Sequence, residues 1–304
     1  MDGVLNVRKA SGPTSHDVVN CIRHIFKQKR VGHAGTLDPM ATGVLVVCLG
    51  KATRLVEYLT NTRKHYRAIL TLGIVTDTQD ATGNILVEKD ASGIDIDQMR
   101  RATAAFAGEI KQIPPMISAI KHQGKPLYKH AREGRTIERS PRPVTIYSIE
   151  ASPVRNMPEG TQSVQVELKV ECSSGTYIRT LCADIGDYLG CGGMMAALER
   201  TRVGSFDIGS SVTVDDLQQA ANEDRLSDFV VPMAKAVGDM PGVEADDAGI
   251  RQIAHGLPIA VMNDLPVGSH ARITYGDDLI AIGIIAQSDD GIYMKPSKVF
   301  CDGV

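Results

Sequence analysis

The chain has 304 residues, 43% of them hydrophobic and 23% charged, which excludes a disordered or collagen-like protein and allows one large domain or two unequal ones. It contains no run near the roughly 20 apolar residues that a membrane helix needs, and its N-terminus lacks the basic and apolar regions of a secretory signal. Its six cysteines form no CxxC pair and no Cys/His cluster, so we expect reduced thiols in the cytoplasm and no zinc site.

The net charge of −3 conceals a strong polarity along the chain. Residues 1–70 carry eleven Lys and Arg against four acids, and residues 121–142 carry seven against two. Beyond Gly242 the sign reverses, with nine acids against four bases. Segregated charge of this kind is typical of a protein that binds a polyanion such as nucleic acid, although charged helix faces exposed to solvent are the alternative interpretation.

Hydrophobic periodicity predicts a succession of strands and helices over the first two thirds of the chain. Helices are expected after Thr14 or Ser15, at 52–59, at 96–106 and from about Tyr177, and strands at 4–7, 44–49, 66–74, 85–87, 144–149 and 164–172. The pattern breaks between 113 and 143, where basic residues and five prolines form a long irregular stretch. A stretch of this length inside a compact domain is usually functional or mobile.

A domain boundary is expected at 238–242, where glycine and proline interrupt the chain. After it the pattern predicts a short helix at 246–254 and strands at 271–275, 280–285 and 293–295. We therefore expect a large domain at 1–238, with the irregular stretch at about 113–143 inserted in it, and a small β-rich domain at 239–304.

The run GHAGTLDPMATG at 32–43 is the most informative part of the sequence. Its glycines and proline indicate a shaped loop, because glycine permits positive φ and proline fixes φ, and the apolar strand that follows would hold this loop rigidly. Asp38 lies within it, either as part of an ordinary Asp-Pro turn or as a reactive carboxylate. In the second case it acts as a nucleophile, a general base or an electrostatic stabiliser.

A second glycine turn, SSGTYIRT at 173–180, offers a partner for this acid. Burial alone raises the pKa of a carboxylate, so a shielded anionic nucleophile needs a cation beside it. Arg179 is a candidate for that cation, with Tyr177 nearby, and a surface arginine at a helix start is the alternative. The sequence has no phosphate-binding P-loop motif, which argues against nucleoside triphosphate binding of that kind.

The run around Asp38 resembles the catalytic motif of the TruB family of pseudouridine synthases, whose pattern is G-H-x-G-x-L-D-P-x-A-T-G. Further segments resemble motifs of that family in order and spacing: 3–15, 64–67, 76–80, 174–181 and 198–204. Each match alone is weak, but their common order over about residues 3–204 argues against chance agreement. One departure is Ala10, which replaces the usual proline after the motif lysine. This difference bears on the stiffness of that loop and does not affect the expected chemistry.

The resemblance implies an α+β fold in which helices flank a central mixed or antiparallel sheet, followed by a PUA-like C-terminal domain. It also implies that the protein isomerises uridine 55 in the TΨC loop of tRNA to pseudouridine, without a cofactor or a metal. Asp38 would be the nucleophile and would add to C6 of the uracil or to C1′ of the ribose. The expected partner is the T-arm stem-loop of tRNA, with no membrane, no obligate protein partner and a monomeric enzyme.

The same resemblance assigns roles to residues around Asp38. Tyr66 would stack on the target base and take part in the final proton removal. Arg179 would keep Asp38 ionised, with Asp80 as a further partner behind it. Tyr177 and Leu198 would line the pocket.

Other residues are implied to bind the RNA or to support the loop. His33 would occupy space opened in the T-loop, and Lys9 would support the loop structure. The basic stretch would form a thumb that closes over the RNA backbone, through Lys125, Lys129 and Arg132. The glycines of the Asp38 run would let the RNA approach the carboxylate closely.

Physical reasoning agrees with these roles and defines the alternatives. A uracil in a folded loop must be flipped out before its C6 or C1′ is reachable, at a cost of roughly a few kcal/mol, and stacking on an aromatic side chain offsets roughly 1–3 kcal/mol. A non-catalytic RNA-binding protein would need none of Asp38, Tyr66 and Arg179. A carboxylate-nucleophile hydrolase or phosphotransferase would need metal-binding acids near Asp38. For Tyr66 the alternative is a packed core tyrosine, and for the C-terminal domain a packing role with minor RNA contact.

Overall fold

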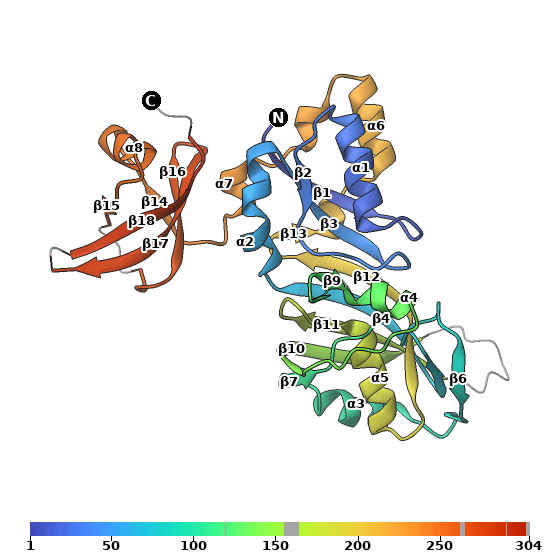
Figure 1. The fold of residues 1–304 in the computed structure, drawn as a ribbon. Coiled ribbons are helices and arrows are strands. Elements are labelled where there is room, and N and C mark those ends of the chain that lie inside the picture. The colour runs from blue at the N-terminus through green and yellow to red at the C-terminus, as the bar shows by residue number, and fades with distance from the viewer. Residues whose placement is uncertain (119, 155–163, 262–264, 290, 302–304) are drawn as a thin grey trace.

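The computed structural model describes all residues of the chain except 119, 155–163, 262–264, 290 and 302–304, and its largest element is a nine-stranded sheet (Figure 1). The strand order is β1-β3-β12-β4-β11-β10-β7, with β2 paired to β3 and β13 to β12. The sheet is mixed, because β12 runs parallel to β3 whereas the other neighbours are antiparallel. Its strands are β1 (Gly3–Lys9), β2 (Val31–His33), β3 (Thr42–Leu49), β4 (Lys64–Leu72), β7 (Gly108–Gln112), β10 (Arg142–Pro153), β11 (Val164–Cys172), β12 (Gly193–Val203) and β13 (Phe206–Asp207).

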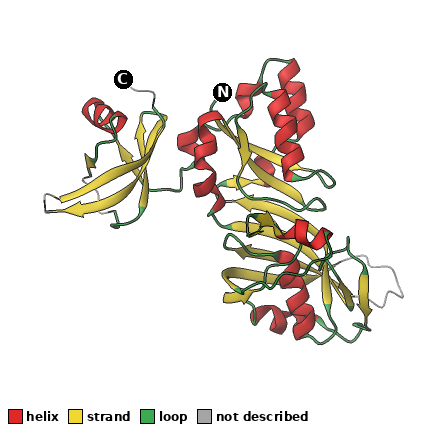
Figure 2. Ribbon diagram, in the orientation of Figure 1, coloured by secondary structure: helices red, strands yellow, loops and turns green. Residues whose placement is uncertain are grey.

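Helices cover this sheet in two groups (Figure 2). At one end α1 (Ser15–Ile25) and α6 (Val214–Asn222) pack on β1 and β3, and at the other α3 (Ile96–Ala104) and α5 (Ile178–Tyr188) pack on β10 and β12. Thr14, one of the two caps that the sequence allows, begins α1 with a reciprocal capping box to Asp17. The other helical segments of this part are η1 (Gly50–Leu55), α2 (Val56–Thr60), η2 (Ile208–Ser210), η3 (Leu226–Phe229) and α7 (Met233–Ala236). The expected α+β fold with flanking helices is confirmed.

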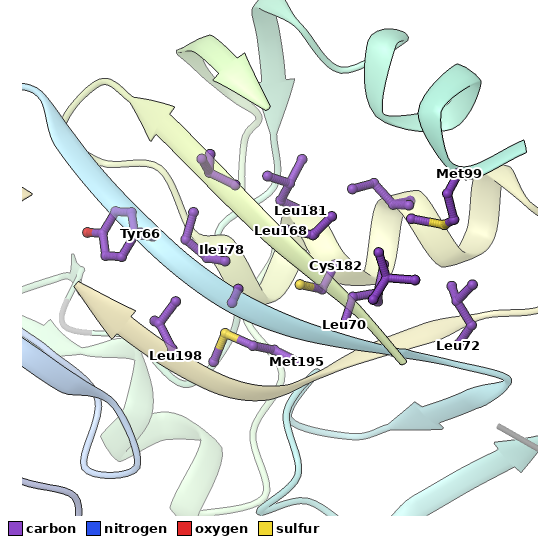
Figure 3. Packing of buried hydrophobic residues seen from close by; sticks show 14 of the residues in the cluster. Tyr66, Leu70, Leu72, Met99, Leu168, Ile178, Leu181, Cys182, Met195 and Leu198 are labelled. Atoms are coloured by element: carbon purple, nitrogen blue, oxygen red, sulfur yellow. The ribbon is translucent and has the colours of Figure 1, made fainter. Parts of the chain in front are cut away.

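A cluster of buried apolar side chains between the sheet and α5 leads to the functional region. Leu72 and Met99 lie at one end of this cluster, and Tyr66 and Leu198 lie at the other (Figure 3). Tyr66 comes from β4 and Leu198 from the adjacent β12. The apolar core therefore extends to the residues that the sequence assigns to a pocket.

Several predicted elements differ in detail from the structure. The predicted strand 66–74 ends at Leu72, because Gly73 adopts φ +86° and a separate β5 (Ile74–Thr76) pairs with β6 (Ile85–Glu88). The predicted helix 52–59 is a 3-10 helix, η1, followed by the short α2. Strand β12 was not expected at all, although it lies in the middle of the sheet.

The stretch 113–143 contains a small hairpin and one short helix. Strands β8 (Lys121–His122) and β9 (Lys125–Pro126) pair with each other, and α4 (Leu127–Arg132) follows directly. The backbone N–H groups of Leu127 and Tyr128 donate to the carbonyls of Ile120 and Ser118, which ties this unit to the chain before it. We call the segment 113–143 the thumb segment.

The C-terminal part forms a second, five-stranded sheet with its own core. The strand order is β14-β16-β17-β18-β15, and the buried residues of this core all lie between Val243 and Met294. Its elements are β14 (Gly242–Glu244), α8 (Asp247–Ala254), β15 (Ile259–Ala260), β16 (His270–Tyr275), β17 (Asp278–Ser288) and β18 (Gly291–Val299). This agrees with the predicted β-rich module, while the exact division at 238/239 stays a prediction.

Candidate active site

The Asp38 loop connects β2 to β3, and two buried side chains hold it in place by hydrogen bonds to its backbone. Lys9, which is 1% exposed, donates from Nζ to the carbonyls of Ala10, Pro39 and Ala41 at 2.9, 3.0 and 2.7 Å. Ser15 Oγ accepts from the N–H of Leu37 at 2.8 Å and donates to its carbonyl at 3.1 Å. Backbone groups on both sides of Asp38 are thus fixed by hydrogen bonds, which makes the loop a rigid support for the carboxylate.

One glycine of the loop has a function in packing within the protein. Gly43 adopts φ +100°, and a Cβ at this position would lie 2.2 Å from the carbonyl oxygen of Arg200. The absence of a side chain therefore lets β3 approach β12 closely. At Gly43 packing within the protein by itself requires glycine, and the access for RNA expected of the loop glycines stays a prediction.

Arg179 and Asp38 form a two-point ion pair. The Arg179 Nε lies 2.9 Å from Asp38 Oδ2, and Nη2 donates to Oδ1 at 3.3 Å. Arg179 is only 3% exposed, and it also donates from Nη2 to the carbonyl of Ile117 at 2.8 Å and from Nη1 to that of Thr78 at 3.3 Å. Its Nη1 lies 3.5 Å from Asp80 Oδ2. The arginine is therefore locked in one orientation, and the expected contacts with Asp38 and Asp80 are present.

Opposing influences act on the Asp38 carboxylate. Burial raises its pKa above the ordinary value, and the negative charge of Asp80 adds to this increase. The charges of Arg179 and Lys9 lower the pKa and so oppose it. The carboxylate is still reachable, because 34% of the Asp38 side chain is exposed. A partly shielded carboxylate beside a fixed cation is suited to a nucleophile or a general base.

Asp38 and Arg179 line a cavity of about 350 Å³. This volume is at the lower end of the roughly 300–1,000 Å³ typical of ligand sites. Tyr66, Tyr177 and Leu198 line the same cavity, so five of the predicted site residues meet there. Burial raises the pKa of the Tyr66 phenol, although the nearby charge of Arg200 opposes this increase. At neutral pH the phenol is therefore protonated.

The other predicted site residues lie outside the cavity lining. Lys9 acts beneath the Asp38 loop, and Asp80 reaches Asp38 only through Arg179. His33, at the end of β2, is half-buried, and burial lowers the pKa of its imidazole. The RNA contact predicted for His33 stays a prediction.

The three thumb residues differ from one another in environment. Lys125 forms an ion pair with Glu133, whereas Lys129 lies exposed on α4. Arg132 ends the same helix, but its side chain lies outside the part of the chain that the structure describes. The thumb segment reaches the cavity through Ser118 and Ile120, which line it.

Three buried polar residues near the cavity were not assigned roles from the sequence. Lys64 and Arg200 line the cavity, and Gln112 fixes the backbone of Tyr177 from both sides, at 3.0 and 3.3 Å. The first two share a sheet face with predicted site residues, since side chains two residues apart on a strand point to the same face, but this relation was not available for Arg200 because β12 was not predicted as a strand. Lys64 precedes Tyr66 by two positions, and Arg200 follows Leu198 by two.

Within the described residues, no three His, Cys, Asp or Glu side chains are arranged to hold a metal ion. No described helix has the length and apolar character that a membrane span requires. The charged side chains that line the cavity are Asp38, Arg179, Lys64 and Arg200.

Comparison with known proteins places this site in context. Residues 23–178 match the model of the TruB family pseudouridylate synthase N-terminal domain, and residues 179–238 match that of the tRNA pseudouridylate synthase B C-terminal domain. A tRNA pseudouridine synthase B of Dehalococcoides mccartyi is 42% identical over 99% of this chain and 97% of its own length. One of Pelotomaculum thermopropionicum is 44% identical over 93% of this chain and 90% of its own length.

Solved structures agree with the sequence relatives. The structure of an H/ACA RNP bound to a substrate RNA containing 2′-deoxyuridine superposes with a TM-score of 0.76 at 29% identity, over 99% of this chain and 85% of that one. A Cbf5-Nop10-Gar1 complex gives 0.75 at 31% identity, over 98% and 85%. The fold, the site and the matching models place the chain among the pseudouridine synthases, which are isomerases.

Within that class the chain belongs to the TruB family. It is an enzyme of the tRNA pseudouridine synthase type, which isomerises uridine.

Proposed function

We propose that the enzyme converts uridine 55 in the TΨC loop of tRNA to pseudouridine, with Asp38 as the nucleophile. The observation that carries this proposal is the two-point ion pair between Asp38 and Arg179 at the wall of the cavity. The pair supplies an oriented carboxylate that stays reachable from the cavity. Nothing in this chemistry requires a cofactor.

The target uridine must leave its stack to reach Asp38. Tyr66 and Tyr177 provide aromatic surface in the cavity, and Leu198 provides an apolar wall. Stacking on one ring stabilises the flipped base by roughly 1–3 kcal/mol, which is comparable to the cost of flipping. The cavity therefore suits a planar base that has been turned out of an RNA loop.

The isomerisation then exchanges one glycosidic bond for another. Asp38 adds to C6 of the uracil or to C1′ of the ribose, the C1′–N1 bond breaks with its electron pair on N1, and the base turns within the cavity. C5 forms the new bond to C1′, the carboxylate is released, and N1 takes up a proton. The hydrogen on C5 finally leaves as a proton, so that no atoms are gained or lost overall.

Tyr66 is our proposed participant in that last proton transfer. Because its phenol is protonated at neutral pH, it can accept the C5 proton only as it releases its own, and that released proton can be the one that N1 of the turned base takes up. Its position beside Leu198, at the cavity end of the core, keeps it in reach of a base bound there (Figure 3). The remaining roles follow the same scheme, with Lys9 and Asp80 supporting Asp38 and His33 meeting the T-loop.

Basic side chains outside the cavity bind the RNA backbone. We propose that the thumb segment closes over the T-arm backbone with Lys125, Lys129 and Arg132, since folded RNA is recognised largely by shape and phosphate contacts. We further propose a catalytic domain at 1–238, a PUA-like domain at 239–304, and a cytoplasmic monomer that acts without a protein partner. The named relatives, which match nearly the whole chain, are tRNA pseudouridine synthases, and this supports tRNA as the substrate.

The decisive experiment incubates the purified protein with unmodified tRNA transcripts and maps pseudouridine at nucleotide resolution. We expect product at position 55 with the wild type and none with Asp38→Asn. A transcript with cytidine at position 55 serves as the matched RNA control. Absence of product with the wild type refutes the proposed reaction, product at another position refutes the proposed site, and product with Asp38→Asn refutes the nucleophile.

A further inference from the structure

Two buried cations line the cavity, and no acidic side chain among the described residues forms an ion pair with either of them. Lys64 is 5% exposed and Arg200 is 1% exposed, and both line the cavity together with Asp38 and Tyr66. They come from β4 and β12, where Arg200 pairs in register with Tyr66. We call Lys64 and Arg200 the cation pair.

Apart from a side-chain hydrogen bond between Arg200 and the hydroxyl of Tyr66, the hydrogen bonds of the cation pair go to backbone carbonyls. Arg200 donates to the carbonyls of Val44 at 2.8 Å, Gly35 at 2.9 Å and Thr36 at 3.4 Å. Lys64 Nζ donates to those of Thr60 and Thr62 at 2.7 and 2.8 Å. Carbonyls solvate a cation but do not neutralise it, so two positive charges remain uncompensated at the cavity.

The acids of the site do not compensate them either. Asp38 and Asp80 both contact Arg179, so among the described residues of the site four buried cations, Lys9, Lys64, Arg179 and Arg200, face two carboxylates. Burying unpaired charge is unfavourable, and burial, together with the nearby charge of Arg200, lowers the pKa of Lys64 to about 8. Such a surplus is expected where a bound substrate brings negative charge.

We propose that the cation pair stabilises the negative charge on the uracil ring during the isomerisation; this inference rests on the proposed function. When the C1′–N1 bond breaks, its electron pair stays on the base, which becomes an anion delocalised over N1 and the two exocyclic oxygens. Addition of Asp38 to C6 instead forms an enolate, which places a negative charge on C5 and O4 of the ring before the C1′–N1 bond breaks. Either route therefore needs cations at the base, whereas Arg179 is occupied at the carboxylate.

The two side chains contribute in different ways. Arg200 also fixes the carbonyls of Gly35 and Thr36 in the Asp38 loop, so its loss would disturb the position of the nucleophile. Lys64 bonds only to the short segment that precedes β4, which makes it the better probe of charge alone. A Cβ placed on Gly35 would lie 3.5 Å from Arg200 Nη1 and 3.7 Å from Lys64 Cε, so both cations reach the same point of the loop.

The test measures single-turnover isomerisation of a tRNA transcript and tRNA binding for Lys64→Gln and Lys64→Arg. Glutamine keeps N–H donors for the two carbonyls but removes the charge, so we expect the rate to fall by about 10²–10³ with the tRNA Kd unchanged. Arginine keeps the charge and should retain the rate within about tenfold. Arg67→Gln is the matched control, because Arg67 lies on the same strand but is exposed and paired with Glu199 at 2.8 Å.

A full rate in Lys64→Gln overturns the proposal, and so does an equal loss in Lys64→Gln and Lys64→Arg, which would indicate a role in packing. A measurement on the wild type covers the case in which the variants fail to fold. Barbiturate has a uracil-like ring that is anionic at neutral pH, and it should bind at least about tenfold more tightly than uracil in calorimetry. Equal affinities overturn the proposal, while the mapping of pseudouridine in the wild type decides separately whether the proposed function holds.

Discussion

At the scale of single residues, the site depends on how Asp38 is kept both charged and reactive. Burial and Asp80 raise the pKa of its carboxyl, and Arg179 and Lys9 oppose them. A carboxylate with a raised pKa is more basic than a surface aspartate, and the ion pair with Arg179 favours its charged form. Asp80 is therefore a means of adjusting Asp38 without touching the substrate.

This argument predicts the effect of Asp80→Asn on the pH dependence of the reaction. Asp38 is active as the carboxylate, so the rate falls as the pH drops through its pKa. Removal of the Asp80 charge lowers that pKa, and the acid limb of the single-turnover profile should move to lower pH. Thr78 and Thr82 can still bond the amide oxygen, so the loop should persist. An acid limb that stays in place or moves to higher pH contradicts the proposed coupling.

Tyr66→Phe separates stacking from proton transfer. The ring remains for the base to stack on, so tRNA binding should be preserved, whereas loss of the hydroxyl should slow turnover by about 10²–10⁴. Tyr147→Phe is the control, because this tyrosine is 43% exposed on β10 and lies under Arg63. Single-turnover rates and binding constants for both variants give the comparison. Full activity of Tyr66→Phe would remove its hydroxyl from the mechanism.

At the scale of elements, the local sequence pattern predicted those strands and helices in which apolar residues recur at the spacing of the element. The strand at 164–172 coincides with β11, and the Thr14 cap of α1 is one of the two that the sequence allows. Strand β12 escaped prediction because its sequence, GMMAALERTRV, is rich in good helix formers, and only its place between β3 and β4 makes it a strand. Intrinsic preference gives way here to tertiary pairing.

The site itself shows the same limit. Asp38 and Arg179 are 141 residues apart in the chain, so no spacing rule joins them, and the expectation that they meet came from the motif resemblance and the need for a cation. Lys64 and Arg200 lie within the motif segments but received no role from the sequence, because their burial depends on the register in which β4 pairs with β12. Residue type and order identify the loop, whereas the charge balance of the cavity requires the folded structure.

The close contact between β3 and β12 predicts a strong response to Gly43→Ala. A Cβ would lie 2.2 Å from a backbone oxygen, and φ is +100°, so we expect destabilisation of more than about 4 kcal/mol or failure to fold. Gly12→Ala is the matched control, since Gly12 has φ +108° but no atom within 4 Å of the added Cβ. Strain alone should cost about 1–3 kcal/mol there. Denaturant unfolding of both variants measures the difference, and equal values would contradict the steric argument.

The thumb segment predicts a change in the salt dependence of tRNA binding. Lys129 is exposed, so Lys129→Met should reduce the slope of log affinity against log salt by about 0.7–0.9. Lys125→Met should reduce it less, because Glu133 already shares that charge. Arg101→Met, on the exposed side of α3, is the control for charge removal elsewhere. Unchanged slopes for both thumb variants would refute the thumb hypothesis.

At the scale of the whole molecule, the C-terminal sheet is joined to the rest by apolar packing as well as by charge. Phe300 is 3% exposed and belongs to the same buried cluster as Leu55 and Ala236. Arg54 lies over its ring at 5.0 Å and donates to the carbonyl of Val299. The two sheets should therefore unfold together, since a shared core couples their stabilities.

Phe300→Ala tests this coupling. Removing a buried phenylalanine costs about 3–5 kcal/mol, and here the loss falls on the contact between the sheets more than on either core. We expect calorimetry to show one transition for the wild type and two for Phe300→Ala, with the C-terminal sheet unfolding first. Tyr275→Ala is the control, because Tyr275 belongs to the same sheet but is 45% exposed. A single transition that only moves to lower temperature would mean that Phe300 stabilises one cooperative unit, and the acidic C-terminal part could then not be treated as a separable domain.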